Sequence, residues 1–134
     1  MTRSRALIFD CFGVLVDARG KRNQPLIDTI AAWRERYKIG VLSNTGRGTF
    51  ERYFSATEGS RLFDAVVLSA ETGYMKPDPE IYELAAERLD TPPEACLFID
   101  DQPDYCLAAE RVGMASLVFI SGDEFEAALR TQLS

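Results

Sequence analysis

The side chains with the clearest chemical potential in this sequence are acids, a hydroxyl and a lysine. Asp10 directly follows the apolar run Ala6–Phe9, and an acidic pair directly follows another apolar run. Two or three carboxylates suit Mg²⁺, which prefers oxygen ligands and keeps several waters. A metal, a lysine, a hydroxyl and free loop amides suit a phosphate group, and a carboxylate held against phosphorus can attack it to form an aspartyl phosphate. The candidate residues for this chemistry are Asp10, Ser43, Lys76, Asp100 and Asp101.

The sequence contains no histidine. This absence excludes Ser-His-Asp and Cys-His nucleophile systems, imidazole-bound metals and histidine acid–base catalysis. The cysteines Cys11, Cys96 and Cys106 are widely spaced and form no C-x-x-C pair, which argues against a disulfide framework or a zinc site. Catalysis would therefore depend on carboxylates, hydroxyls, lysine and an oxygen-ligated cation.

Apolar runs alternate with amphipathic segments along the chain, which is typical of a parallel sheet built from βαβ units. Continuous apolar runs predict buried strands at 6–9, 39–42, 63–68, 95–99 and 115–120. The spacing of apolar residues and the positions of prolines predict helices at 25–37, 47–55, 79–89, 103–112 and 123–133. Asp78 is the expected N-cap of the third helix, and turns or loops are expected at 14–24 and 69–76. Because all strands of a parallel sheet end at one edge, the candidate residues should converge there.

Four segments of the chain resemble, in order, the four motifs of the haloacid dehalogenase-like (HAD) hydrolase superfamily. Each motif alone is weakly specific, but four in the family's order over nearly the whole chain are strongly so. The segments are Phe9–Leu15, Leu42–Thr45, Gly73–Tyr82 and Phe98–Asp101. The resemblance implies an α/β, Rossmann-like three-layer sandwich with a five-stranded parallel sheet in the order 5-4-1-2-3. It also implies a single core domain over residues 1–134.

The resemblance implies a catalytic or binding role for each matched residue. Asp10 would be the nucleophile of a phosphohydrolase. The Ser43 hydroxyl would bind the transferring phosphoryl group, and Lys76 would neutralise the charge of the nucleophile and the phosphate. Asn44 would supply a backbone amide to the phosphoryl group, and Gly13 would adjoin it.

The resemblance also implies a Mg²⁺ site at the same edge of the sheet. Asp10, Asp101 and the backbone carbonyl of Phe12 would bind the ion, with Asp100 beside them, and Phe12 would adjoin the substrate. Two adjacent acids at the end of an apolar strand are costly unless a cation lies between them. The acidic pair therefore agrees with a metal site.

The chain departs from phosphatases of this superfamily in two ways. Those enzymes usually carry a second aspartate, two positions after the nucleophile, which protonates the leaving oxygen and then activates the hydrolytic water; here this position is Phe12. Such a group is worth about 10²–10⁴-fold in rate, so weak activity is expected, with acyl or aryl phosphates least affected. Asp17, in the following turn, is an alternative acid/base. Secondly, the predicted elements fill residues 11–42 and 44–75, which leaves no room for a cap domain and predicts an open site.

Other interpretations remain beside the phosphohydrolase. The main one is a catalytically impaired relative that binds Mg²⁺ and a phosphorylated partner or acts as an interaction module, and Phe12 favours it. A dehalogenase is disfavoured by the acidic pair and the missing cap, and a phospho-acceptor receiver by the place of the acidic pair after the fourth strand. Taken singly, Ser43 could cap a helix, Lys76 could be a surface lysine, and Asp100-Asp101 could be a capping pair.

The charge and hydropathy of the sequence limit the partners and the cellular location to be expected. The net charge of −6 predicts that nucleic acid is not a partner, although the basic cluster Arg19–Arg22 could contact an anionic substrate. No apolar run approaches the ~18 residues needed to span a bilayer, so no membrane association and a cytoplasmic location are expected. The expected partner is a phosphorylated substrate, either small or macromolecular. The oligomeric state stays open, and a homodimer that covers the open site is one arrangement.

Overall fold

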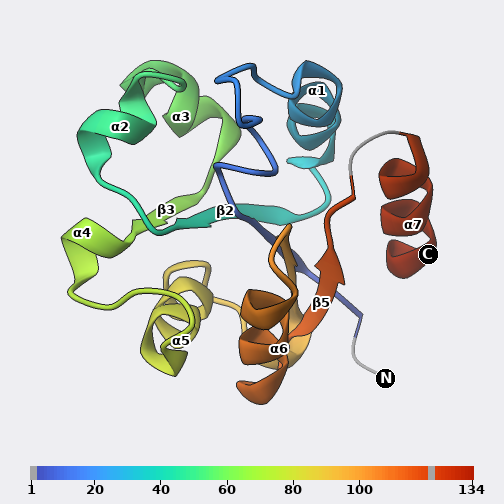
Figure 1. The fold of residues 1–134 in the computed structure, drawn as a ribbon. Coiled ribbons are helices and arrows are strands. Elements are labelled where there is room, and N and C mark those ends of the chain that lie inside the picture. The colour runs from blue at the N-terminus through green and yellow to red at the C-terminus, as the bar shows by residue number, and fades with distance from the viewer. Residues whose placement is uncertain (1–2, 121–122) are drawn as a thin grey trace.

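The computed structural model describes residues 3–120 and 123–134. Its centre is a five-stranded, all-parallel sheet in the order β3-β2-β1-β4-β5 (Figure 1). The strands are β1 (Ala6–Phe9), β2 (Lys38–Ser43), β3 (Ala65–Leu68), β4 (Cys96–Asp100) and β5 (Ala115–Val118). This is the order that the family resemblance implies, counted from the opposite edge of the sheet. The predicted fold class is therefore confirmed.

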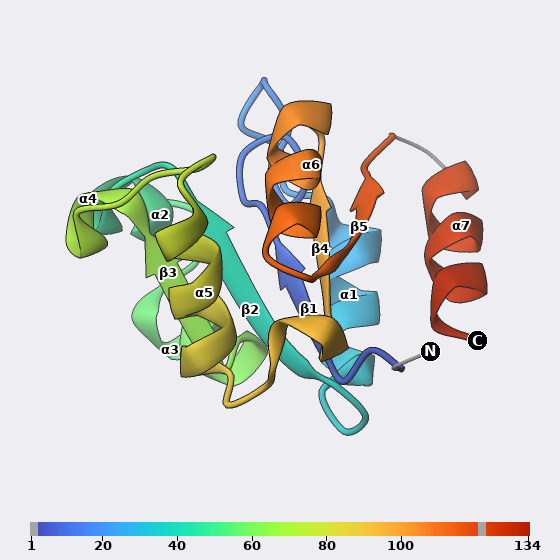
Figure 2. The ribbon, with the colours of Figure 1, turned by 90° about the horizontal axis from the view of Figure 1, so that it is seen from below.

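Helices cover both faces of the sheet and complete the three layers (Figures 1 and 2). One face is covered by α1 (Gln24–Trp33), α2 (Arg47–Glu51), α3 (Ala56–Leu62) and α7 (Asp123–Leu133). The other face is covered by α5 (Pro79–Arg88) and α6 (Pro103–Arg111). Two short connections are α4 (Ser69–Thr72) and a 3₁₀ turn at Pro93–Ala95.

Every side chain of the central strand β1 is buried, because both faces of the sheet are covered. Leu7 and Phe9 join the core cluster that includes α1, whereas Ala6 and Ile8 join the cluster that includes α5 and α6. This alternation is the two-residue period of a strand. The backbone N–H of Asp10 then donates to the carbonyl of Ile99 at 2.9 Å, so the acid is held at the end of the packed strand.

Two of the predicted helices have the wrong boundaries. The helix expected at 25–37 ends at Trp33, because the residues after it form a turn in which the N–H of Tyr37 donates to the carbonyl of Trp33 at 2.9 Å. The helix expected at 47–55 is only α2, and α3 was not predicted. Ser55 begins α3 as its N-cap, and its hydroxyl accepts from the N–H of Glu58 at 3.2 Å.

One prediction for residues 69–78 is corrected, and the predicted N-cap position of Asp78 is confirmed. The expected loop begins with the short helix α4, which ends at Gly73 in the left-handed conformation (φ 81). Asp78 occupies the N-cap position of α5, but its side chain makes no capping hydrogen bond there. Its carboxylate instead accepts from the N–H of Met75 at 3.2 Å and closes the preceding turn.

The stretch between Asp10 and Lys76, where a cap domain would be inserted, is described throughout. This stretch contains α1 to α4, β2, β3 and their turns, with no folded insertion. The expected irregular hairpin after β1 is present, with isolated bridges from Val16 to Phe12 and to Arg22. In the described ranges, no helix is both long and apolar enough to cross a membrane.

Candidate active site

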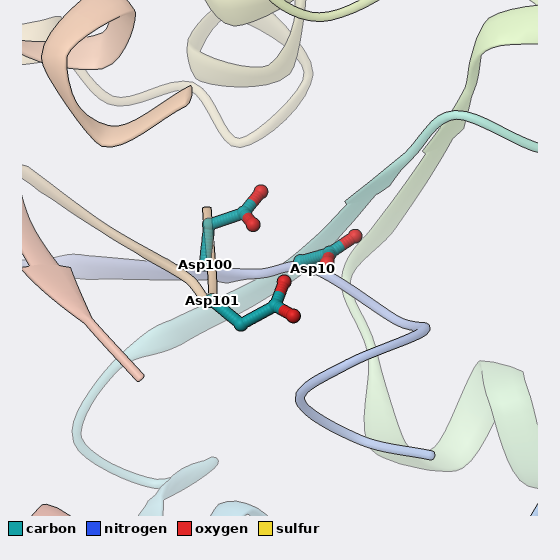
Figure 3. A group of neighbouring side chains, drawn as sticks. All are labelled: Asp10, Asp100 and Asp101. Carbon is teal, nitrogen blue, oxygen red and sulfur yellow. The ribbon is translucent and has the colours of Figure 1, made fainter. Parts of the chain in front are cut away.

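Three carboxylates meet at the edge of the sheet where the strands end (Figure 3). Asp10 follows β1, Asp100 ends β4, and Asp101 follows it. One oxygen of each lies within 4.8 Å of one oxygen of the other two. Asp10 and Asp100 are buried, and Asp101 is partly exposed. The predicted convergence of these acids is therefore present in the structure.

Lys76 lies between two of these acids. Its Nζ is 2.9 Å from Oδ1 of Asp10 and 2.7 Å from Oδ2 of Asp100, and only 2% of its side chain is exposed. The ammonium also lies over the ring of Tyr105, 4.9 Å from the centroid. Lys76 is thus a buried ion-pair partner, and the alternative of a surface lysine is wrong.

The pKa values of the side chains in this cluster reflect their burial and their neighbours. Burial raises the pKa of Asp10 to about 7, although the ammonium of Lys76 acts in the opposite direction. Burial alone would lower the pKa of Lys76, but the carboxylates of Asp10 and Asp100 outweigh it and raise that pKa. Burial and the neighbouring carboxylate of Asp100 raise the pKa of Asp101. The charged forms of Asp10 and Asp101 are therefore less favourable in this site than in water.

The donor set of this cluster fits a divalent cation. Three carboxylates converge, and Lys76 is the ammonium paired with Asp10 and Asp100, while Asp101 has no ion-pair partner among the described residues. Mg²⁺ prefers oxygen ligands, and the edge of the sheet where the strands end supplies them. Asp101 and Asp10 are the more accessible ligands, because both oxygens of Asp100 are engaged by Lys76 and by the N–H of Gln102.

Gly13 allows the backbone to approach the carboxylate of Asp101 closely. A Cβ at Gly13 would lie 2.5 Å from Oδ2 of Asp101, and the glycine has φ +105. Both the contact and the left-handed conformation disfavour any larger residue. The turn after β1 is therefore shaped around the acid that follows β4.

Asn44 performs a function in the structure that sequence reasoning missed. Its side-chain Oδ1 accepts from the backbone N–H of Lys76 at 2.8 Å, and its Nδ2 donates to the backbone carbonyl of Lys76 at 3.1 Å. The two bonds fix the backbone from which the buried lysine extends. Ser43, the preceding residue, is buried at the end of β2. Because Gly46 is the N-cap of α2, Ser43 does not cap that helix.

Phe12 is packed as a structural residue in the position where phosphatases carry their second aspartate. Its ring meets the ring of Tyr53 edge to face, with the centroids 5.4 Å apart. The candidate substitute Asp17 is exposed, and its carboxylate accepts from the N–H groups of Arg19 and Lys21, both at 2.9 Å. The carboxylate of Asp17 therefore stabilises the turn that contains it.

Two other residues near this edge, Arg22 and Cys11, also do not offer a reactive group to the site. Arg22 does not offer a free charge, because its guanidinium makes a two-point ion pair with Glu58 at 2.7 and 2.8 Å. Cys11 is fully buried, and burial raises the pKa of its thiol to about 12, so it is not a reactive thiolate.

Comparison with known proteins identifies the class of protein that this fold and site define. The family model described as "haloacid dehalogenase-like hydrolase" matches residues 23–113. The chain therefore belongs to the haloacid dehalogenase-like hydrolase family. The matched range includes Ser43, Lys76 and the acidic pair after β4, and it begins after Asp10.

Individual relatives agree with this assignment. A phosphatase of Mycobacterium tuberculosis, MT3486, is 36% identical over 101 residues, which are 74% of this chain and 46% of the relative. A crystal structure of an uncharacterised protein from Corynebacterium glutamicum has a TM-score of 0.81 at 26% identity and covers 96% of this chain and 94% of its own. A mutant of a HAD family enzyme of Bacteroides thetaiotaomicron, in complex with magnesium and inorganic phosphate, has a TM-score of 0.82 at 18% identity. The match covers 95% of this chain and 100% of that one.

The curated relatives are longer than this chain. The chain spans between 17% and 48% of the length of eight of them.

Proposed function

We propose that this chain is a Mg²⁺-dependent phosphohydrolase that works through an aspartyl phosphate on Asp10. The observation that carries the proposal is the buried Asp10 carboxylate, held 2.9 Å from the ammonium of Lys76 and clustered with two further acids. The phosphatase relative and the neighbour crystallised with magnesium and inorganic phosphate support it.

Each residue of the site has a chemical task in this reaction. A carboxylate oxygen of Asp10 attacks phosphorus, the bond from phosphorus to the leaving oxygen breaks, and the electron pair leaves with that oxygen. Water then attacks the phosphorus of the aspartyl phosphate, which releases inorganic phosphate and regenerates Asp10. Lys76, the Ser43 hydroxyl and the backbone N–H of Asn44 hold the phosphoryl oxygens, and Gly13 leaves space beside them.

Asp10, Asp101 and the backbone carbonyl of Phe12 would hold Mg²⁺, with Asp100 beside them. When bound, the ion supplies positive charge next to the nucleophile and the phosphoryl oxygens. Asp100 fixes Lys76 through the 2.7 Å contact with its ammonium. The lysine is thereby aimed at Asp10 before any substrate enters.

Phe12 limits the reaction. A missing general acid/base costs about 10²–10⁴-fold in rate. The leaving group must depart without a proton, so acyl and aryl phosphates are better substrates than alkyl phosphates. Water attack on the aspartyl phosphate loses the same base, and we expect the second step to be slow as well.

The same residue supports one alternative. A relative that binds Mg²⁺ and a phosphorylated partner, with little or no turnover, would keep Asp10, Lys76 and the metal site but would not need an acid at position 12. The packing of Phe12 against Tyr53 makes this position part of the fold. Measured turnover of a phosphorylated substrate distinguishes the phosphohydrolase from the binding protein.

The test is hydrolysis of p-nitrophenyl phosphate, with Mg²⁺ and with EDTA, by the wild type, Asp10→Asn and Phe12→Asp. Asp28→Asn is the matched control, because this exposed acid of α1 is outside the site. Metal-dependent turnover that is lost in Asp10→Asn and kept in Asp28→Asn supports the phosphohydrolase. An increase in turnover in Phe12→Asp shows that the missing acid at position 12 limits the rate. No turnover by folded wild type and folded Phe12→Asp supports the binding protein instead.

A further inference from the structure

A second charged region lies at the opposite end of the sheet from the candidate active site. Its cations come from the segment before β1, from the turn between α1 and β2, and from the first residue of β2. In Figure 2 this turn lies at the end of β2 opposite to its arrowhead. The N–H of Lys38 donates to the carbonyl of Arg5 at 3.0 Å, which brings the two segments together. We call these residues the basic recess: Arg3, Arg5, Arg34, Arg36 and Lys38.

The basic recess is hollowed. Two adjoining cavities of about 470 and 460 Å³ lie here, and both are lined by Arg5, Arg36 and Tyr37. Cavities of about 300–1,000 Å³ are the size that small-molecule ligands occupy in proteins. The recess is therefore large enough for a small ligand that contacts several of its cations together.

The recess carries an excess of positive charge in an acidic protein of net charge −6. Its acidic lining residues are Asp64 and Asp90. Arg34 pairs with Asp64 at 3.0 Å, and the other four cations have no ion-pair partner among the described residues. Nη1 of Arg34 is buried and has no hydrogen-bond partner in the same part of the chain. A buried donor of this kind is costly unless a ligand oxygen accepts from it.

We propose that the basic recess binds the di- or triphosphate group of a small molecule. Several arginines line this hollow, and guanidinium groups match phosphate oxygens in charge and in planar, two-point geometry. The two adjoining cavities suit a linear group with more than one phosphate. A nucleic acid fits less well, because its backbone would extend beyond the recess over the surface of a protein whose net charge is −6. A phosphate bound here is at the other end of the strands from Asp10, so this is a binding site and not a second catalytic one.

The single tryptophan of the chain provides a direct readout. The ring of Trp33 meets the ring of Tyr37 edge to face, with centroids 6.1 Å apart, and Arg36 lies 5.7 Å from the Tyr37 ring centroid. Occupation of the recess should therefore change the fluorescence of Trp33. The probe is tripolyphosphate, titrated into the protein in EDTA, with calorimetry as the second measurement. Saturable binding that weakens as salt is raised is expected.

Paired variants test where the anion binds. Arg5→Gln with Arg36→Gln removes two exposed cations of the recess, whereas Arg88→Gln with Arg111→Gln removes two exposed cations from the ends of α5 and α6. The first pair should weaken binding of tripolyphosphate about 100-fold, since each charged hydrogen bond is worth about tenfold or more. The second pair should weaken it less than about threefold. Equal weakening by both pairs, or no saturable binding to the wild type, overturns the proposal.

Further arms identify the ligand source and exclude the candidate active site. ADP that binds more tightly than pyrophosphate assigns the group to a nucleotide, and equal binding assigns it to an inorganic polyphosphate; both results support the phosphate site. Adenosine that binds as tightly as ADP overturns it. Asp10→Asn should bind tripolyphosphate as the wild type does. A change of affinity in this variant, in either direction, also overturns the proposal, because it places the anion at the catalytic edge.

Discussion

Replacement of Lys76 by methionine should destabilise the protein strongly in the absence of metal. The Lys76 ammonium is the cation within ion-pair distance of two carboxylates whose side chains are 8% (Asp10) and 0% (Asp100) exposed. Removing one partner of a buried ion pair leaves an uncompensated buried charge and costs about 3–5 kcal/mol. Methionine is unbranched and apolar and fills most of the same space, so little of the loss comes from a cavity.

The assay is thermal and urea unfolding in EDTA. For a chain of this length each kcal/mol shifts Tm by about 3–5 °C, so Lys76→Met should lower Tm by roughly 10–20 °C. Lys38→Met is the control, because Lys38 is exposed, and such surface changes are usually within about 0.5 kcal/mol. The double variant Lys76→Met with Asp100→Asn should recover part of the loss, since it removes one of the stranded acids.

Magnesium gives the second arm of the same experiment. A cation bound beside Asp10 replaces part of the charge that Lys76 supplied, so Mg²⁺ should raise the Tm of Lys76→Met more than that of the wild type. The reasoning is refuted if Lys76→Met loses no more stability than Lys38→Met in EDTA, or if the double variant is less stable than Lys76→Met.

Three further changes have definite expectations. Gly13→Ala should displace the carboxylate of Asp101, because its Cβ would lie 2.5 Å from Oδ2, and should weaken Mg²⁺ binding measured by calorimetry by about 10–100-fold. Asn44→Ala removes both hydrogen bonds to the backbone of the buried lysine and should cost about 1–3 kcal/mol in urea unfolding, together with a loss of any phosphatase kcat. The hydrogen bond from Arg22 lowers the pKa of Glu58 below its ordinary value of 4.5. The ionised Glu58 carboxylate therefore stabilises the fold above pH 4.5, and this stabilisation is lost as the pH falls through the lowered pKa. Glu58→Gln should accordingly be more destabilising at pH 7 than at about pH 3.

Each of these changes has a matched control. Gly48→Ala introduces a Cβ with nothing within 4 Å, and it should leave Mg²⁺ affinity unchanged. Asn23→Ala removes the N-cap of α1, so it should cost about 1 kcal/mol and spare activity. Glu51→Gln removes an exposed pair with Arg47 at 4.0 Å and should show little pH dependence. If any variant and its control behave alike, the contact assigned to that residue does not act as described.

The sheet and the convergence of acids at its edge could be predicted, because their signals are local. The apolar run before Asp10 is a buried strand, and its burial on both faces explains why no alternating pattern appears in it. The acidic pair at the end of β4 was predicted to need a cation, and the structure places the ammonium of Lys76 2.7 Å from Asp100. Lys76 was a candidate from its type and position, but its role beside Asp10 came from the family resemblance, since nothing in its neighbours marks it as buried.

The details that were missed depend on contacts between distant segments or on weak local patterns. The hydrogen bonds from Asn44 to the backbone of Lys76 join residues far apart in sequence and leave no periodic signal. The packing of Phe12 on Tyr53 is of the same kind. Helix α3 lacks an apolar stripe, but Ser55 and Glu58 have the spacing of a capping box, which could have revealed its start.

The central claim is that Asp10 is the residue that accepts the phosphoryl group. The most direct measurement is peptide mass spectrometry of the protein after incubation with acetyl phosphate and Mg²⁺ and an acid quench. Because Phe12 replaces the base that would speed hydrolysis, the aspartyl phosphate should accumulate, and a single phosphoryl group should be found on Asp10 in the wild type and nowhere in Asp10→Asn. A phosphoryl group on another residue, or equal labelling of the two proteins, would contradict the account.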